Sequence, residues 1–236
     1  MVDVSTDNRY YAARASEYDD IYRKPERQPD LRQIEKWLPP FLASRKVLEI
    51  ACGTGYWTQF IAPTAEHVVA LDNSAEVIDI AKTRVPANKV TFHVADAYQL
   101  PSDLEICNAA FAGFWFSHVP KRRRGEFLRG LNTRLAPGAT VLLLDNRYVP
   151  GSSSEIAGIN SDGDTFQMRK LKDGSTHRVL KNFPAESELQ MTLQELGLTG
   201  TYTAWPYYWA VQYTVASLTT AVGCDRQLSG YQTNTI

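Results

Sequence analysis

The sequence has little cysteine, and its cysteines form no pattern that suggests a cross-link. The 236 residues include three, Cys52, Cys107 and Cys224, which are odd in number and widely spaced. This spacing fits neither a disulfide framework nor the ligand set of a structural metal site. We therefore expect free thiols, no metal, and a reducing compartment such as the cytoplasm.

Neither sign of charge is in excess. The chain has 25 lysines and arginines against 26 aspartates and glutamates, which gives a formal net charge of -1. Proteins that bind nucleic acid or an anionic membrane surface usually have a basic excess, so we expect neither partner. The basic run at residues 121–124 could contact phosphates. It opens an amphipathic stretch, however, and is better interpreted as a solvated helix face.

Long apolar runs are missing as well. No uninterrupted stretch is long enough to cross a bilayer, and residues 1–7 lack the basic and apolar regions of a signal peptide. With 44% hydrophobic residues the chain can still bury one substantial core. We predict one domain over residues 1–217 and a polar tail over 218–236. Residues 147–183 are expected to form an inserted loop and hairpin, either a lid or a subunit contact.

Short apolar runs recur along the chain and are mostly separated by stretches with helical periodicity. This alternation predicts an α/β fold, a single Rossmann-like domain with a mostly parallel central sheet flanked by helices. The runs cover residues 47–51, 68–71, 90–94, 106–111 and 141–144.

Start and stop signals define several of the connecting elements. Asn73 or Ser74 can cap a helix that follows the second run. A helix over residues 121–135 is expected to end at the Ala-Pro-Gly turn 136–138, and one over 186–196 at Gly197. Asp-Gly at 173–174 separates two strand-like runs and predicts a β-hairpin insertion after the fifth strand. An aromatic run over 205–215 is expected to finish the sheet.

The first apolar run leads into a glycine turn, Cys52-Gly53-Thr54-Gly55. A dinucleotide-binding loop would need a third glycine at position 58, where the helix approaches the pyrophosphate. Thr58 stands there, after the bulky Tyr56 and Trp57. The turn therefore favours a nucleoside with a small charged part, such as S-adenosylmethionine, over NAD. Glu49 could orient this loop or approach the ligand ammonium, and a solvated strand-end acid is the alternative.

Further marks follow in order along the chain. Asp72 ends the second run, the pair Asp96-Ala97 follows the third, a tyrosine-rich segment at 10–19 precedes the first, and a Leu-Ala-Pro-Gly turn lies at 135–138. With this spacing the chain resembles the class I S-adenosylmethionine-dependent methyltransferases, in particular their small-molecule branch. The resemblance covers residues 10–146 and implies S-adenosyl-L-methionine as cofactor and S-adenosyl-L-homocysteine as product.

The resemblance also implies which residues contact the cofactor. Glycines at 53 and 55 let the backbone approach the methionine portion. Asp72 would accept hydrogen bonds from both ribose hydroxyls, with a helix cap as the alternative. Asp96 would hold the adenine amino group, with a turn residue as the alternative. The full candidate set is Tyr11, Tyr18, Ala51, Gly53, Thr54, Gly55, Asp72, Asn73, Asp96, Ala97 and Phe114.

The segment after the fourth run, residues 113–120, should face the methyl group. His118 is the best-placed base by sequence, although a structural hydrogen bond that stiffens the turn is the favoured alternative. Candidate acceptor contacts are Trp115, Asn146, Tyr148 and Tyr208. Together with the aromatic run they suggest a flat, weakly polar acceptor, aromatic or heteroaromatic, methylated on oxygen or nitrogen. Many of these rings could instead be core.

The sequence thus predicts methyl transfer to a small molecule. Three rivals stay open: a cofactor-binding protein without transferase activity, a methyltransferase acting on RNA or protein, and, least favoured, an NAD-linked oxidoreductase. A homodimer is one option for the assembly, which the sequence does not decide.

Overall fold

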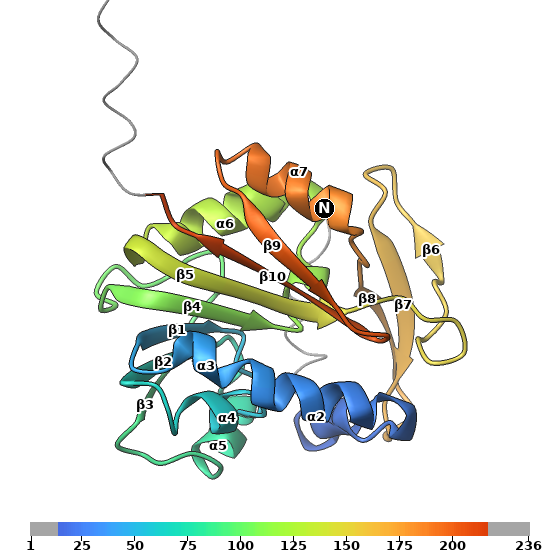
Figure 1. Cartoon of the computed structure of the whole chain (residues 1–236). Coiled ribbons are helices and arrows are strands. Elements are labelled where there is room, and N and C mark those ends of the chain that lie inside the picture. Colours follow the sequence, from blue (N-terminus) through green and yellow to red (C-terminus); the bar gives the residue numbers. More distant parts are fainter. Residues whose placement is uncertain (1–13, 217–236) are drawn as a thin grey trace, which may run out of the picture.

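The computed structural model describes residues 14–216, and they form an α/β domain around one large sheet (Figure 1). Its seven strands have the order β3-β2-β1-β4-β5-β10-β9. The first five strands are parallel, and β10 is antiparallel to both of its neighbours, β5 and β9. The strands are β1 Lys46–Ile50, β2 His67–Asp72, β3 Val90–Val94, β4 Cys107–Gly113, β5 Leu135–Asn146, β9 Gly200–Ala204 and β10 Tyr208–Thr214. The predicted fold class is confirmed.

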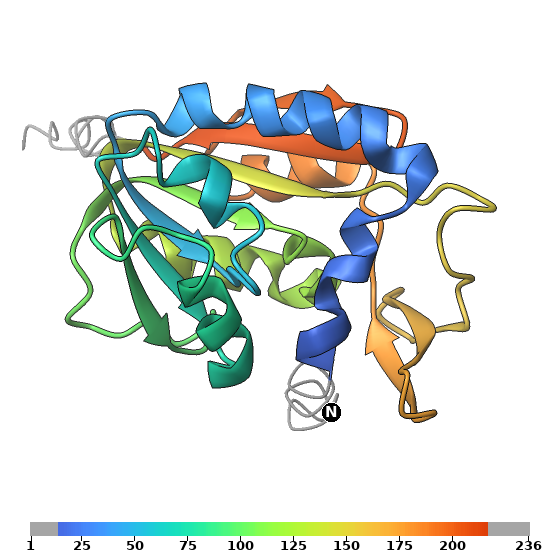
Figure 2. The same cartoon turned by 90° about the horizontal axis from the view of Figure 1, so that it is seen from below.

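Helices cover both faces of this sheet (Figures 1 and 2). One face carries α2 Gln28–Trp37, α3 Pro39–Leu42, α4 Thr58–Ile61 and α5 Ala75–Lys82, and the other carries α6 Arg124–Asn132 and α7 Glu186–Gln194. Short 3-10 helices lie at η1 Ala15–Tyr22, η2 Pro25–Arg27, η3 Phe116–His118 and η4 Lys121–Arg123. No helix within residues 14–216 is long and apolar enough to span a bilayer.

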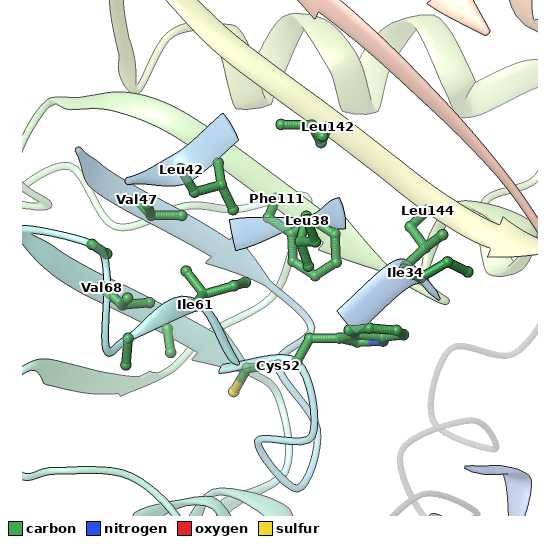
Figure 3. Packing of buried hydrophobic residues seen from close by; sticks show 14 of the residues in the cluster. Ile34, Leu38, Leu42, Val47, Cys52, Ile61, Val68, Phe111, Leu142 and Leu144 are labelled. Atoms are coloured by element: carbon green, nitrogen blue, oxygen red, sulfur yellow. The ribbon is translucent and has the colours of Figure 1, made fainter. Parts of the chain in front are cut away.

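The alternation of side chains along each strand fills two cores. Figure 3 shows the first, where Ile34 of α2 and Leu38, between α2 and α3, face Phe111 and Leu144 of the sheet. Cys52 belongs to the same cluster and is a free, buried thiol. Burial of such side chains stabilises the fold by roughly 1.5–3 kcal/mol each. Both faces of the central strands are therefore closed, and ligands can reach the sheet only at its ends.

One expectation about element bounds was wrong. The helix predicted over 121–135 begins as η4, and its α-helical part ends at Asn132, because Leu135 already pairs with Cys107 of β4 as the start of β5. The register shifts between Cys107 and Ala109, which accommodates Pro137 and Gly138 within the strand. As expected, the aromatic run 205–215 contains the last strand along the described chain, β10, although β9, which the sequence did not predict, forms the edge of the sheet.

The predicted hairpin insertion is confirmed. Strands β7 Thr165–Lys170 and β8 Thr176–Leu180 pair in antiparallel fashion, with the short β6 Gly158–Ile159 added on the other side of β7. This small sheet lies beside the carboxyl end of β5 and opposite η1 (Figures 1 and 2). It therefore stands next to the edge where the strand tips converge. The predicted tail, 218–236, is outside the described residues.

Candidate functional site

The carboxyl ends of β1 and β4 are adjacent, and each is followed by a residue in the left-handed region of backbone space. Ala51 has φ +54° and Phe114 has φ +59°. This conformation costs roughly 1–2 kcal/mol for a residue with a side chain. Two such residues at neighbouring strand tips place the strain at the edge where ligands bind in open α/β sheets.

The glycine turn after β1 is closely packed. Gly53 has φ +54°, and a Cβ atom there would lie 3.1 Å from the Tyr18 ring. Gly55 has φ +77°, and a Cβ atom there would lie 3.0 Å from Ala81 of α5. Both positions need glycine for backbone conformation and for space. The turn therefore lies directly beneath η1, which carries Tyr18.

Asp72, at the tip of β2, holds this turn in place. Its Oδ2 accepts a hydrogen bond from the Gly53 amide at 2.9 Å, and its Oδ1 accepts one from the Ser74 amide at 3.0 Å. Burial raises the pKa of the Asp72 carboxyl, while these amides act in the opposite direction. The helix cap is Ser74, whose hydroxyl accepts from the Val77 amide. Ser74, and not the carboxylate of Asp72, therefore caps α5.

A cavity of about 440 Å³ opens along these strand tips. This is within the range of about 300–1,000 Å³ typical of small-molecule sites. Predicted cofactor residues in its wall are Tyr18, Ala51, Asp72, Asn73, Asp96, Ala97 and Phe114. Asp96 is exposed, and its Oδ1 also accepts from the Tyr98 amide, so it forms a turn as well. The buried Tyr98 hydroxyl and Trp115 indole N–H, from two residues of this wall, have no hydrogen-bond partner among residues 14–216.

Thr54 contacts the leading segment rather than the cavity wall. Its hydroxyl donates to Asp19 Oδ1 at 2.6 Å, and Arg84 forms an ion pair with Asp19 Oδ2 and a 3.3 Å hydrogen bond with the Thr54 hydroxyl. This three-residue network fastens η1 to the glycine turn. The sequence did not single out Asp19 or Arg84, because they come from segments far apart in the chain.

Glu49 lies on β1 and is only 1% exposed. Burial, the largest cause, raises the pKa of its carboxyl to about 8, and the nearby charge of Asp72 acts in the same direction. Its Oε2 has no hydrogen-bond partner within the described residues. Of the two interpretations of Glu49, the alternative of a solvated strand-end acid is therefore excluded, since the strand is covered on both faces.

A second, smaller cavity of about 80 Å³ adjoins the first. Three residues line both: Tyr18 of η1, Phe114 after β4, and His118 of η3. The Phe114 ring is stacked between Tyr22 and Tyr208, with ring centroids 5.5 Å apart on each side. The position of Phe114 is therefore fixed by aromatic packing, and the two cavities meet at a rigid wall.

His118 has a defined electrostatic environment. Burial and then the positive charge of Lys181 keep the pKa of its imidazole well below the ordinary value, and the ring also makes a hydrogen bond with the Leu180 backbone. Lys181 Nζ donates to Asp145 Oδ1 at 3.1 Å and to the Ser117 hydroxyl at 2.5 Å. Neutral imidazole is the form that can accept a proton. The sequence did not single out Lys181 or Asp145.

The other predicted acceptor residues are spread over different surroundings. Trp115 lines the first cavity, and Asn146 lines the second. Tyr148 is 38% exposed and packs edge-on against Phe183. Tyr208 is buried beneath Phe114 and is in neither cavity wall. Tyr11, a predicted cofactor contact, lies outside the described residues.

Comparisons with known proteins agree with this geometry. A family model described as "Methyltransferase domain" matches residues 47–138. The chain is 35% identical over 91 residues to a malonyl-[acyl-carrier protein] O-methyltransferase of Bacillus cereus, covering 36% of this chain and 33% of that protein. It is 30% identical over 164 residues to a demethylmenaquinone methyltransferase of Staphylococcus aureus, covering 64% of this chain and 67% of that protein. The chain spans less than half the length of the first curated relatives it matches.

A solved structure described as "DhpI-SAH complex structure" has the same fold over most of its length. It is 29% identical with a TM-score of 0.75, and the match covers 90% of this chain and 96% of that one. The Staphylococcus aureus relative, the methyltransferase family model and this fold lead to one assignment. The chain belongs to the class I S-adenosylmethionine-dependent methyltransferases.

Proposed function

We propose that this chain transfers a methyl group from S-adenosyl-L-methionine to a small-molecule acceptor and leaves S-adenosyl-L-homocysteine as product. The observation that carries the proposal is the meeting of two cavities at Tyr18, Phe114 and His118. The larger cavity has the strand-tip acids that suit a nucleoside. The smaller one is open to an acceptor on the other side of the same three residues.

The residues of the larger cavity fit this cofactor. Asp72 would hold the ribose hydroxyls, because the two oxygens of a carboxylate have about four acceptor positions in all and the backbone amides of Gly53, Asn73 and Ser74 use three of them at most. Asp96 and the amide of Ala97 would hold the adenine. Gly53 and the buried Glu49 lie on the side expected for the methionine portion. Ala51, Thr54, Gly55, Asn73 and Phe114 complete the proposed cofactor contacts.

When bound, S-adenosyl-L-methionine supplies an electrophilic methyl group whose bonding electron pair returns to sulfur on transfer. The chain then has to orient the acceptor in line and exclude water, which can supply most of the acceleration. Tyr18 and Phe114 form the wall between the cavities and would define that line. His118 would take the proton from a hydroxyl or ammonium acceptor at a ring nitrogen not engaged with Leu180.

The relatives support a small-molecule acceptor, since one carries the name of a demethylmenaquinone methyltransferase and another that of a malonyl-[acyl-carrier protein] O-methyltransferase. Trp115 and Asn146 are the predicted acceptor contacts that lie in the cavities. A cytoplasmic location and a homodimer belong to the proposal too. The former is supported by the free thiols of Cys52 and Cys107, and light scattering of the purified chain would measure the latter.

A transfer assay tests the proposal directly. Purified protein is incubated with methyl-labelled cofactor and a panel of small hydroxy, amino and acidic compounds, and label in the product is counted. Calorimetry with S-adenosyl-L-homocysteine runs in parallel. Cofactor binding without transfer to any compound would favour the non-catalytic alternative. Transfer to RNA or protein would favour the alternative of a macromolecular acceptor, and for RNA the binding should weaken steeply with salt, because it depends on phosphate contacts.

The role of His118 has its own test. His118→Asn keeps a hydrogen-bonding side chain for the Leu180 backbone but removes the base, so the turnover number for a hydroxyl acceptor should fall by about 100-fold or more. The dissociation constant for S-adenosyl-L-homocysteine should stay the same. His67→Asn, at the first residue of β2, is the matched control and should leave the turnover number unchanged. Unchanged turnover in His118→Asn would leave this histidine with a purely structural role.

A further inference from the structure

The second cavity is lined by cationic side chains from distant parts of the chain. Among residues 14–216 there are five of them: Arg14 at the start of the leading segment, Lys24 and Arg27 before α2, Arg169 on β7, and Lys181 after β8. Polar groups fill the space between them, including Asn146, Ser152 and Gln167. The hairpin insertion and the leading segment thus bring their positive charges to one small space.

Arg27 is the most informative of these residues, because it is 5% exposed. Its guanidinium donates to Asn146 Oδ1 at 2.7 Å, to the Ser152 hydroxyl at 2.9 Å and to the Ser153 hydroxyl at 3.4 Å. All three acceptors are neutral, and no ion pair among the described residues includes Arg27. A buried charge without a direct ion pair is costly, and here the guanidinium is held by neutral acceptors and by the rings of Tyr207 and Tyr208, whose centroids lie 5.3 and 5.7 Å from its carbon.

The acids near the cavity do not balance its cations. Asp145 is engaged by Lys181 and by the amides of Ser117 and Asn146. Glu26 is exposed and accepts from the Ser152 hydroxyl at 2.7 Å. Burial, and then the charge of Arg27, lower the pKa of Lys24. These contacts leave a positive excess directed at the cavity.

We propose that this second cavity binds the oxyanion of a small acidic acceptor, either a carboxylate or a phosphate-type group, beside the position of methyl transfer. The inference rests on the proposed function and specifies its acceptor. A volume of about 80 Å³ admits only a few heavy atoms. Arg27 and Arg169 offer planar donor forks that match oxyanions. This proposal replaces the expectation of a flat, weakly polar acceptor with that of an acceptor that carries negative charge.

A second source of negative charge is the carboxylate of the cofactor itself. Tyr18 lies over the glycine turn, and Arg14 lies 5.5 Å from its ring centroid, so Arg14 is on the side where that carboxylate would be. Lys24, Arg27 and Arg169 come from beyond Phe114 and His118, on the acceptor side. The two sources predict opposite effects of cofactor product on anion binding.

The test uses inorganic phosphate as probe and follows its phosphorus NMR line width with the full chain, with and without saturating S-adenosyl-L-homocysteine. We expect phosphate to bind in both states, acetate to displace it, and the neutral isostere acetamide to leave it bound. Arg169→Met and Lys24→Met should each weaken phosphate binding by about tenfold or more. Arg23→Met, which removes an exposed charge paired with Asp20, is the matched control and should change binding less than about twofold.

Three results would overturn the inference: no phosphate binding by the wild type, equal binding by Arg169→Met and wild type, or displacement of phosphate by S-adenosyl-L-homocysteine. Displacement by S-adenosyl-L-homocysteine would mean that the cations of the second cavity bind the carboxylate of the cofactor. Calorimetry with S-adenosyl-L-homocysteine separates this failure from that of the proposed function. If the product does not bind, the proposed function fails, while the phosphate titration of the free protein still judges the anion site.

Discussion

The ribose role proposed for Asp72 leads to a quantitative prediction for Asp72→Ala. Hydrogen bonds to a charged group contribute about 1.5–3 kcal/mol each, and two of them to the ribose give roughly 3–6 kcal/mol. The Gly53 and Ser74 amides also lose their acceptor, so the glycine turn should loosen. We expect the dissociation constant for S-adenosyl-L-homocysteine to rise by about 100-fold or more, since 1.4 kcal/mol corresponds to a factor of ten.

Isothermal calorimetry at fixed pH and ionic strength measures this change. Asp72→Asn keeps one acceptor oxygen and should give an intermediate loss, which guards against a misfolded alanine variant. Asp79→Ala removes the same charge from an exposed position on α5, where Lys82 is its one ion-pair partner within the described part of the chain, and should bind like wild type. Binding by a folded Asp72→Ala variant within about threefold of wild type would refute the ribose assignment.

Two further predictions concern buried and linking groups. Burial raises the pKa of Glu49 from 4.5 to about 8, so folding favours its protonated form, and its contribution to stability declines as the pH rises through that interval. The decline in the free energy of unfolding should amount to at most about 1.4 kcal/mol per pH unit, and Glu49→Gln should remove it. Urea unfolding of the free protein at pH 5 and pH 8 measures the change, and an unaltered pH dependence in Glu49→Gln would contradict the prediction. Asp19→Asn weakens the link of η1 to Thr54 and Arg84, and should raise the dissociation constant for S-adenosyl-L-homocysteine about fivefold. Asp20→Asn is its control, and equal affinity of the two variants would exclude a role for the link.

The cofactor side of the fold could be predicted because its signals are local. The runs that became β1 to β5 end in residues whose position at a strand tip follows from parallel pairing alone. Asp72 and the pair Asp96-Ala97 reach one cavity for that reason. The hairpin at Asp173-Gly174 was equally readable, since this pair marks a turn between two strand-like runs, and residues 171–175 connect β7 to β8 in the structure.

The acceptor side could not be predicted in the same way. Lys24 and Arg27 lie far along the chain from Arg169 and Lys181, and sequence alone does not distinguish any of the four from other cations. The sequence suggested instead that the aromatic run 205–215 contacts the acceptor. Trp209 and Tyr213 of this run are buried, because β10 lies inside the sheet between β5 and β9. Only the tertiary arrangement reveals which charges converge.

The hairpin insertion carries part of the proposed acceptor site, whereas the proposed cofactor site lies in the main sheet. Arg169 and Lys181 belong to it or follow it directly, whereas Asp72, Asp96 and the glycine turn are built into the main sheet. Exchange of this module between related chains would therefore change Arg169 and Lys181 while Asp72, Asp96 and the glycine turn stay in place. Lys24 and Arg27 lie outside the module, so a complete change of the proposed acceptor site needs a second segment of the gene as well.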